Sequence, residues 1–393
     1  MEFILRHVKK SGLFGWLYAV VLCNAFQFYA LHYLNSSYLG KHLTSTEVGF
    51  MFSASSALTL IVLLSAVLFL ARFGNYYTVL GATLINFTAL VGLSLVSHVG
   101  WIFVFFVLHM ISVPVTLFCL DVFMENFIED ESTTGSARGI FLSVTMLSAL
   151  FSPVVSGWVV GPESTYEKAY ALGALYLVPT LLLIVFRFRN FVDPVYKVLS
   201  PRKMVQAIYG DKDIFHISFA QLLLRFYFSW MVIFLPIYLH SYVGFSWLEI
   251  GTILFIMLIP YILIQYPAGV IADRYLGEKE MLITGFIIMS ASTAMLFFLQ
   301  STSVMLWGFV LFTTRIGAAL IETMTETYFF KKIDGKDASV LSLFRVLRPF
   351  AYILGPLTGG ILLIYIDMQM LWLILSAVVL VGIWNGSRIT DTR

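Results

Sequence analysis

Charge is what this sequence has least of. Only 12% of its 393 residues are Asp, Glu, Lys or Arg, whereas 60% are hydrophobic and the mean hydropathy is +0.90. A water-soluble fold needs a polar surface, so this composition excludes an ordinary globular domain and predicts that lipid is the solvent. The formal net charge of +2 gives no sign of a nucleic-acid partner.

Cysteines, metal-ligand clusters and nucleotide-binding loops are also scarce or missing. Cys23 and Cys119 both fall inside hydrophobic runs, so we expect no disulfide framework. The sequence has no G-x-x-x-x-G-K-[ST] loop, and no gap between hydrophobic runs is long enough for a soluble catalytic domain. No His or Cys cluster has metal-ligand spacing. We therefore expect neither an enzyme nor an ATP-driven pump, and no cofactor.

Hydrophobic runs fill nearly the whole chain. A helix needs roughly 20 apolar residues to cross a bilayer, and these segments qualify: 12–34, 46–71, 77–97, 99–127, 137–160, 167–188, 214–242, 246–272, 280–300, 303–330, 338–366 and 368–386. Seven of the eight Trp residues lie near the ends of these segments, where indole rings prefer the headgroup level: Trp16, Trp101, Trp158, Trp247, Trp307, Trp372 and Trp384. We predict an all-α integral membrane protein with twelve transmembrane helices.

Lys and Arg are concentrated on one side of the predicted membrane. The two termini and alternate loops hold 18 of the 24 basic residues, whereas the opposite loops hold only Lys41 and Lys168. The positive-inside rule then places both termini in the cytoplasm. We expect a multi-pass protein of the plasma or inner membrane.

Landmarks recur along the chain at an offset of about 200 residues. They repeat in the same order, as Glu47-Val48-Gly49 and Glu249-Ile250-Gly251, Arg72 and Arg274, Asp121 with Glu125 and Glu322 with Glu326, and Ser152-Pro153 and Gly355-Pro356. This predicts two parallel six-helix repeats related by an axis along the membrane normal. The expected boundaries are 1–190 for an N-terminal bundle, 191–213 for a cytoplasmic linker and 214–393 for a C-terminal bundle.

The loop after the eighth predicted span resembles the signature of the major facilitator superfamily, G-x-x-x-D-R-x-G-R/K-R/K. It reads Gly269-Val270-Ile271-Ala272-Asp273-Arg274-Tyr275-Leu276-Gly277-Glu278-Lys279, with one extra residue before Gly277 and an acid at Glu278 where a base is usual. The corresponding first-half loop, 71–76, keeps Arg72-x-Gly74 but has Ala71 in place of the acid. The resemblance implies that family's fold and secondary transport by alternating access.

Four residues of the later loop are candidates for gating. An acid at the end of one helix can accept hydrogen bonds from the N-terminus of a neighbouring helix, and a glycine allows two helices to approach closely. These roles would suit Asp273 and Gly269, with Arg274 and Gly277 completing the loop. A solvated helix end is the alternative.

Charges inside the spans are the next signal, because each costs about 2.5–3.5 kcal/mol at a helix centre. Arg225 and Arg315 lie near the membrane midplane. The resemblance implies that the first, fourth, seventh and tenth helices line a central cavity, so both are candidate substrate-binding residues. Their planar guanidinium groups suit a carboxylate or phosphate. Pairing of either Arg with Asp121 across the cavity is equally open.

An acid-base cluster is expected between the tenth and eleventh predicted spans. Glu322 and Glu326 lie one turn apart, and so do Arg345 and Arg348 at the same depth on the next helix. A structural or gating cluster is one interpretation, with Glu326, Arg345 and Arg348 as gating residues. A proton-coupling site at Glu322 is the other.

Asp121 on the fourth span is a second proton-coupling candidate, because desolvation favours the neutral form of a carboxyl group. A salt bridge to Arg138 is the alternative. The uncharged residues Asn24, Gln27 and His109 lie at middle depths. They are candidate substrate contacts, or hydrogen-bonding links between helices.

The sequence thus predicts a secondary active transporter that moves a small solute and is coupled to a proton gradient. Two Arg residues favour an anionic or polyhydroxyl solute, whereas 36 Phe and 15 Met would suit multidrug-type efflux of amphiphiles. A transport-dead sensor on the same scaffold is a third interpretation. The expected partners are the solute, a proton or counter-solute, and the lipid bilayer, and we expect a monomer.

Overall fold

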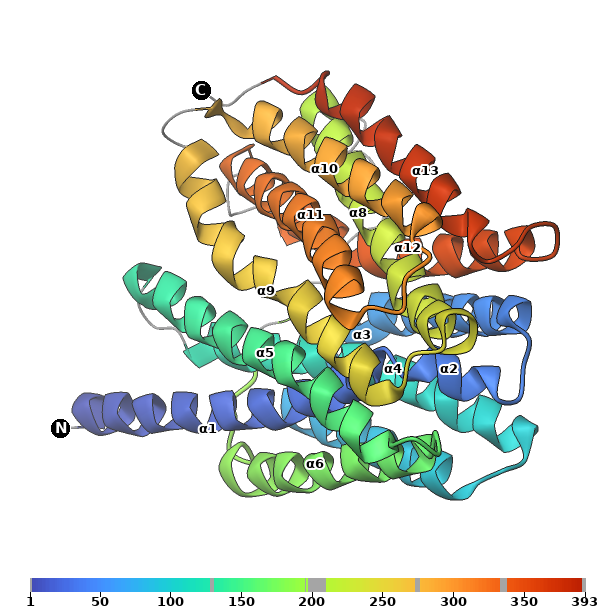
Figure 1. Cartoon of the computed structure of the whole chain (residues 1–393). Helices are drawn as coiled ribbons and strands as arrows, with labels where there is room; N and C mark the ends of the chain where they lie inside the picture. The colour runs from blue at the N-terminus through green and yellow to red at the C-terminus, as the bar shows by residue number, and fades with distance from the viewer. Residues whose placement is uncertain are drawn as a thin grey trace. The chain divides into compact units, whose positions relative to one another are not determined.

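The computed structural model describes residues 2–127, 131–194, 196, 210–272, 276–332 and 338–390. These residues contain no strand, which confirms the predicted all-α class (Figure 1). The helices in chain order are α1 (Glu2–His32), α2 (Asn35–Gly40), α3 (Ser45–Leu95), α4 (Val99–Phe127), α5 (Glu131–Val160), α6 (Tyr166–Arg187), α8 (Lys212–Ile237), the π-helix η1 (Tyr238–Val243), α9 (Trp247–Ile271), α10 (Glu278–Phe298), α11 (Val304–Lys332), α12 (Ala338–Leu362) and α13 (Met370–Gly386).

Most predicted spans coincide with these helices. In the described part of the chain nine helical segments are long and apolar enough to cross a membrane, and Val346–Leu362 and Met370–Gly386 are shorter apolar helices. The predicted spans 46–71 and 77–97 both fall within α3. Its 51 residues include a break at Gly74, where φ is 78° and ψ is 163°. A side chain would strain such a backbone, so glycine allows the chain to turn between two helical stretches.

Contacts divide the chain into two compact units. Unit 1 comprises Met1–Leu34 and Leu58–Val198, and unit 2 comprises Asn35–Ala57 and Leu199–Arg393. The short helix α2 and the beginning of α3 therefore belong to unit 2, although they precede most of unit 1 in the sequence. No sequence signal pointed to α2, whose six residues Asn35–Gly40 include an Asn and two Ser and yet are largely buried.

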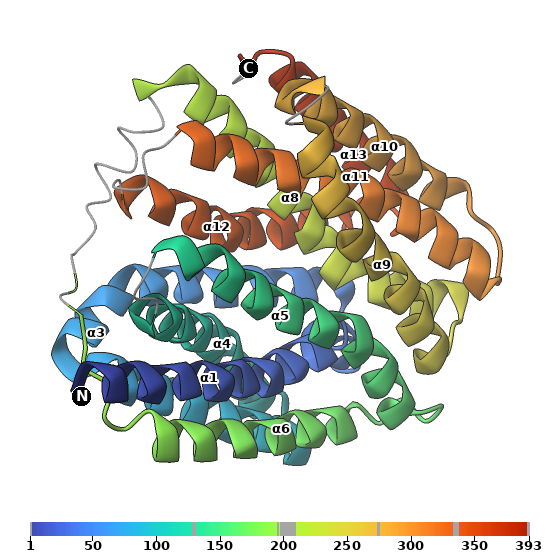
Figure 2. The ribbon, with the colours of Figure 1, turned by 90° about the vertical axis from the view of Figure 1, so that its left-hand side faces the viewer.

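Unit 1 is built around α1, which lies between α5 and α6 in both views (Figures 1 and 2). Small polar residues bring α1 and α5 together: the hydroxyl of Ser148 donates to the Leu22 carbonyl over 3.4 Å, and that of Ser152 donates to the Phe26 carbonyl over 3.3 Å. Such residues let helix backbones approach in a membrane, where lipid tails compete with apolar packing.

Unit 2 relies on glycine for its closest helix contacts. α10 packs against α11 and α13 (Figure 1). A Cβ on Gly317 of α11 would lie 2.5 Å from the carbonyl oxygen of Gly285 on α10, so only glycine fits there. The beginning of α3 approaches α12 in the same way, since a Cβ on Gly49 would lie 2.5 Å from the Pro356 carbonyl oxygen and 3.2 Å from the Gly360 Cα.

Two landmarks that recur in the sequence also share their local structure. Glu47 accepts from the backbone N–H of Thr44 over 2.8 Å at the start of α3, and Glu249 accepts from that of Ser246 over 2.8 Å at the start of α9. Each cap hydroxyl accepts in return from the glutamate's own N–H, which completes a capping box. Gly277, before α10, has φ 88° and ψ 164°, close to the values of Gly74.

Candidate functional site

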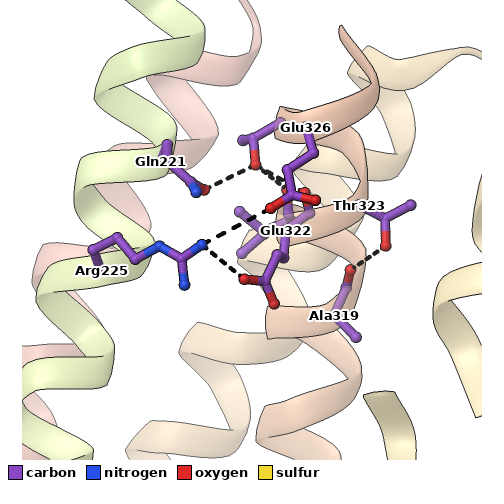
Figure 3. Close-up of polar contacts among 8 residues, drawn as sticks. Gln221, Arg225, Ala319, Glu322, Thr323 and Glu326 are labelled. Atoms are coloured by element: carbon purple, nitrogen blue, oxygen red, sulfur yellow. Dashed lines mark hydrogen bonds and ion pairs between the residues drawn. The ribbon is translucent and has the colours of Figure 1, made fainter. Parts of the chain in front are cut away.

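An ion pair joins α8 to α11 within unit 2. Nη2 of Arg225 lies 2.8 Å from Oε1 of Glu322 and 4.0 Å from Oε1 of Glu326. Figure 3 draws both ion pairs as dashed lines. The side chains of Arg225 and Glu322 are 18% and 17% exposed, whereas that of Glu326 is 51% exposed. Glu322 and Glu326 reach the same cation because residues four apart share one face of a helix.

Neutral side chains hold the arginine in place. Gln221 lies one turn before Arg225 on α8. When its amide is oriented to satisfy both ends, the nitrogen donates to Thr325 Oγ1 over 3.0 Å and the oxygen accepts from Arg225 Nε and Nη2 over 3.2 and 2.9 Å. The guanidinium is therefore bound by its own helix as well as by α11, which limits its freedom to rotate.

A second arginine shares an aromatic neighbour, the ring of Phe228, with Arg225. Arg315 on α11 is 1% exposed, and its Cζ lies 5.5 Å from the ring centroid of Tyr227 and 5.1 Å from that of Phe228. Cζ of Arg225 lies 5.7 Å from the Phe228 centroid, so one ring is within cation-π range of two guanidinium groups. We call Arg225, Phe228, Arg315, Glu322 and Glu326 the charged seam.

The expected acid-base cluster of Glu322 and Glu326 with Arg345 and Arg348 stays a prediction, since the structure describes only part of it. Glu322 faces α8 and pairs with Arg225, whereas Arg348 on α12 is exposed and its Cζ lies 5.9 Å from the Tyr352 ring centroid. The side chain of Arg345 lies outside the described residues. The pairing of Glu322 with Arg225 was not expected, because shared depth does not determine the direction in which a helix turns its charged face.

Two of the neutral candidates, Gln27 and His109, join a hydrogen-bond network inside unit 1. The amide nitrogen of Asn86 on α3 donates to Oε1 of Gln27 over 3.2 Å, and Nδ1 of His109 lies 2.8 Å from Oδ1 of Asn86. Asn24, Gln27 and Asn86 are fully buried, and His109 is 2% exposed. The two hydrogen bonds join α1, α3 and α4, as polar links between helices do.

The remaining candidates lie on other elements or outside the described residues. Asp121 is half-buried on α4 in unit 1. A Cβ on Gly269 would meet no atom within 4 Å, so the close helix approach expected there is absent among the described residues. Gly277 forms the N-cap of α10. Asp273 and Arg274 lie outside the described residues.

Sequence reasoning missed Gln221, Phe228 and Thr325. A signal existed, because Gln221 and Phe228 lie four residues before and three after Arg225 and so share its face of α8. The sequence signals considered were the charged residues of the spans, and the uncharged residues that contact the Arg225 guanidinium were not among them. Among the described residues no three His, Cys, Asp or Glu side chains are grouped so that they could hold a metal ion.

Comparisons with known proteins agree with this architecture. Residues 217–388 match the family model of the Major Facilitator Superfamily. No curated protein sequence matches the chain.

Among solved structures, the nucleoside transporter NupG is similar over 96% of this chain and 98% of its own, with 15% identity and a TM-score of 0.73. A bacterial homologue of the human lysosomal transporter Spinster, inward-facing and unoccupied, is similar over 96% and 93%, with 11% identity and a TM-score of 0.71. The human organic anion transporter MFSD10 is similar over 96% and 99%, with 14% identity and a TM-score of 0.67. At these identities the likeness establishes the fold.

Proposed function

Because residues 217–388 match the family model of the Major Facilitator Superfamily and the fold is that of solved transporters, we propose that this multi-pass membrane protein is a transporter of that family, coupled to protons and carrying a small anionic solute. The solute crosses by alternating access. The observation that carries the proposal is the partly buried ion pair of Arg225 and Glu322.

The chemistry of the pair suits coupling. An ionised Glu322 neutralises Arg225, so an anion gains little by approaching that guanidinium. Protonation of Glu322 removes the competing charge, and the planar fork of Arg225 then recognises a carboxylate or phosphate. Release of the proton restores the ion pair and favours release of the solute. Glu326, the more exposed acid, provides a second proton acceptor at the same cation.

The proposal of an anionic solute is supported by the two buried or partly buried guanidinium groups of the seam, at Arg225 and Arg315. One of the similar structures is that of an organic anion transporter and another that of a nucleoside transporter. A nucleoside is uncharged and would not need two cations, so the seam favours the anion.

The arrangement that we propose for the transporter is two six-helix repeats, 1–190 and 214–393, joined by the linker 191–213, with both termini in the cytoplasm. The matching capping boxes at Thr44 and Ser246 support the repeats, as do the matching backbone angles at Gly74 and Gly277.

Flux measurements in proteoliposomes test the function. The purified protein is reconstituted, a pH gradient is imposed, and uptake of radiolabelled organic anions, nucleosides and amphiphilic drugs is compared. We expect gradient-driven uptake of an anion. In Glu322→Gln this accumulation is lost, while exchange of solute across the membrane persists, because a neutral residue cannot release a proton.

The control is Glu163→Gln, which neutralises an exposed acid in the turn after α5. It should behave like the wild-type protein. Proton coupling that survives in Glu322→Gln but disappears in Asp121→Asn would move the proton site to α4 in unit 1. Uptake of amphiphiles alone would favour multidrug efflux, and the absence of any flux would favour a sensor.

A further inference from the structure

The helix break at Gly74 is held by an acid from a distant part of unit 1. The backbone N–H of Asn75 donates to Oδ1 of Asp193 over 2.7 Å, 118 positions along the chain. The hydroxyl of Tyr196 donates to the same oxygen over 2.5 Å. A Cβ on Gly74 would collide with Oδ2 of Asp193, so the glycine makes room for the carboxylate.

Asn75 is itself anchored to a neighbouring helix. Its side chain is fully buried, and its amide nitrogen donates to the carbonyl oxygen of Cys119 on α4 over 3.0 Å. The residue therefore connects α3, α4 and the segment after α6 at one point. A displacement of Asp193 would therefore break or move the hydrogen bond at the start of the helical stretch that follows Gly74.

The helical stretch that begins at Asn75 needs a hydrogen-bond acceptor from another part of the chain. The first N–H groups of a helix lack partners within the helix, and the helix dipole favours a negative charge beside them. The loop before it offers Ala71 where the resembling signature has an acid, and the first turn, 75–78, contains no acid. In unit 2 the equivalent helix, α10, carries Glu278 and Glu280 in its own first turn.

We propose that Asp193 takes the place of the missing loop acid and acts as a positioning residue in the transport cycle. It fastens the segment after α6 to the helix that begins at Asn75. The inference rests on the proposed transport function.

Tyr196 reinforces the attachment. Burial, and secondly its hydrogen bond to the Asp193 carboxylate, raise the pKa of the Tyr196 hydroxyl above its ordinary value. The hydroxyl therefore stays protonated and remains a donor throughout the physiological range. Asp193 consequently keeps both donors, one from the backbone of α3 and one from its own segment.

The consequence for transport is specific. Asp193 belongs to unit 1 and the proposed solute contacts of the charged seam belong to unit 2, so loss of the Asp193 carboxylate should leave solute affinity unchanged and slow the conformational step. The maximal rate should fall while KM stays constant. Because capping requires an acceptor oxygen and not a charge, Asn should substitute for Asp.

The test compares Asp193→Ala, Asp193→Asn and the exposed control Glu163→Ala in nanodiscs and in proteoliposomes. In Asp193→Ala, the amide of Asn75 should exchange with deuterium about tenfold faster, as expected for one lost hydrogen bond, and turnover should fall severalfold at unchanged KM. Asp193→Asn and Glu163→Ala should resemble the wild-type protein in both measurements.

Three results would overturn the inference: unchanged exchange at Asn75 in Asp193→Ala, faster exchange with an unchanged maximal rate, or Asp193→Asn as impaired as Asp193→Ala. If Asp193→Ala does not fold, Asp193→Asn with wild-type exchange and turnover supports a capping role, and an impaired Asp193→Asn contradicts it. A wild-type protein that carries no solute refutes transport itself, and the exchange data then still report on the cap.

Discussion

The two units bury polar groups in different ways. Unit 1 links α1, α3 and α4 through the neutral amides of Gln27 and Asn86 and the imidazole of His109. Unit 2 links α8 to α11 through the full charges of Arg225 and Glu322. Amide networks hold helices together at modest cost, whereas a partly buried ion pair responds strongly to the loss or neutralisation of one partner. Under the proposed function, unit 1 provides anchoring and unit 2 responds to protons.

The largest expected effect follows from breaking the ion pair. Arg225→Ala leaves Glu322 partly buried without its cation, which should lower the free energy of unfolding by about 3 kcal/mol. Solute flux should be abolished, because the arginine is also the proposed anion contact. Thermal unfolding and proteoliposome flux measure the two consequences separately.

The matched control is the double variant Arg225→Met with Glu322→Leu. Replacing both charges by apolar groups of similar size should restore most of the stability and none of the transport. A double variant that is no more stable than Arg225→Ala would mean that the pair is not energetically coupled. Flux that survives in Arg225→Ala would remove the arginine from the site.

A smaller effect is expected from the network of unit 1. Gln27→Leu removes the acceptor of the Asn86 amide nitrogen and leaves that buried donor unpaired, which should cost about 1–3 kcal/mol of stability. Transport per folded molecule should be unchanged. Thermal unfolding alongside a flux assay would show this, and a raised KM at unchanged stability would instead return Gln27 to the solute site.

The smallest expected effect is an increase in stability, whereas the changes above lower it. In the described part of the chain, neither amide atom of the fully buried Asn24 has a hydrogen-bond partner. Asn24→Leu, a substitution of similar size, removes two desolvated polar atoms and should stabilise unit 1 by up to about 1 kcal/mol. A lower midpoint of thermal unfolding in this variant would show that Asn24 takes part in the network.

Much of the fold could be predicted from the sequence because the bilayer imposes a length on each hydrophobic segment. The ends of α4 and α6 lie within one or two residues of the predicted spans. The glycines before the third and ninth predicted spans also marked true breaks in the helices, since their backbone angles exclude other residues.

The pairing of side chains could not be predicted in the same way. Depth along the membrane normal placed Glu322 level with Arg345 and Arg348, but the rotation of each helix about its own axis decides which neighbour a side chain reaches. That rotation depends on packing with several helices at once, as at the contact of Gly285 and Gly317. The hydrogen bond from the Asn75 N–H to Asp193 could not be predicted for a related reason, because 118 positions separate the two residues.

The sequence distance of each helix cap sets an order of assembly during synthesis. The backbone N–H groups of Thr44 and Ser246 donate to glutamates three positions away. The caps of α3 and α9 can therefore form as soon as those few residues leave the ribosome. The helical stretch that begins at Asn75 must wait until residue 193 has been made. Its first turn is therefore completed only after the last helix of unit 1 has been made, which places this junction among the final contacts to form in unit 1.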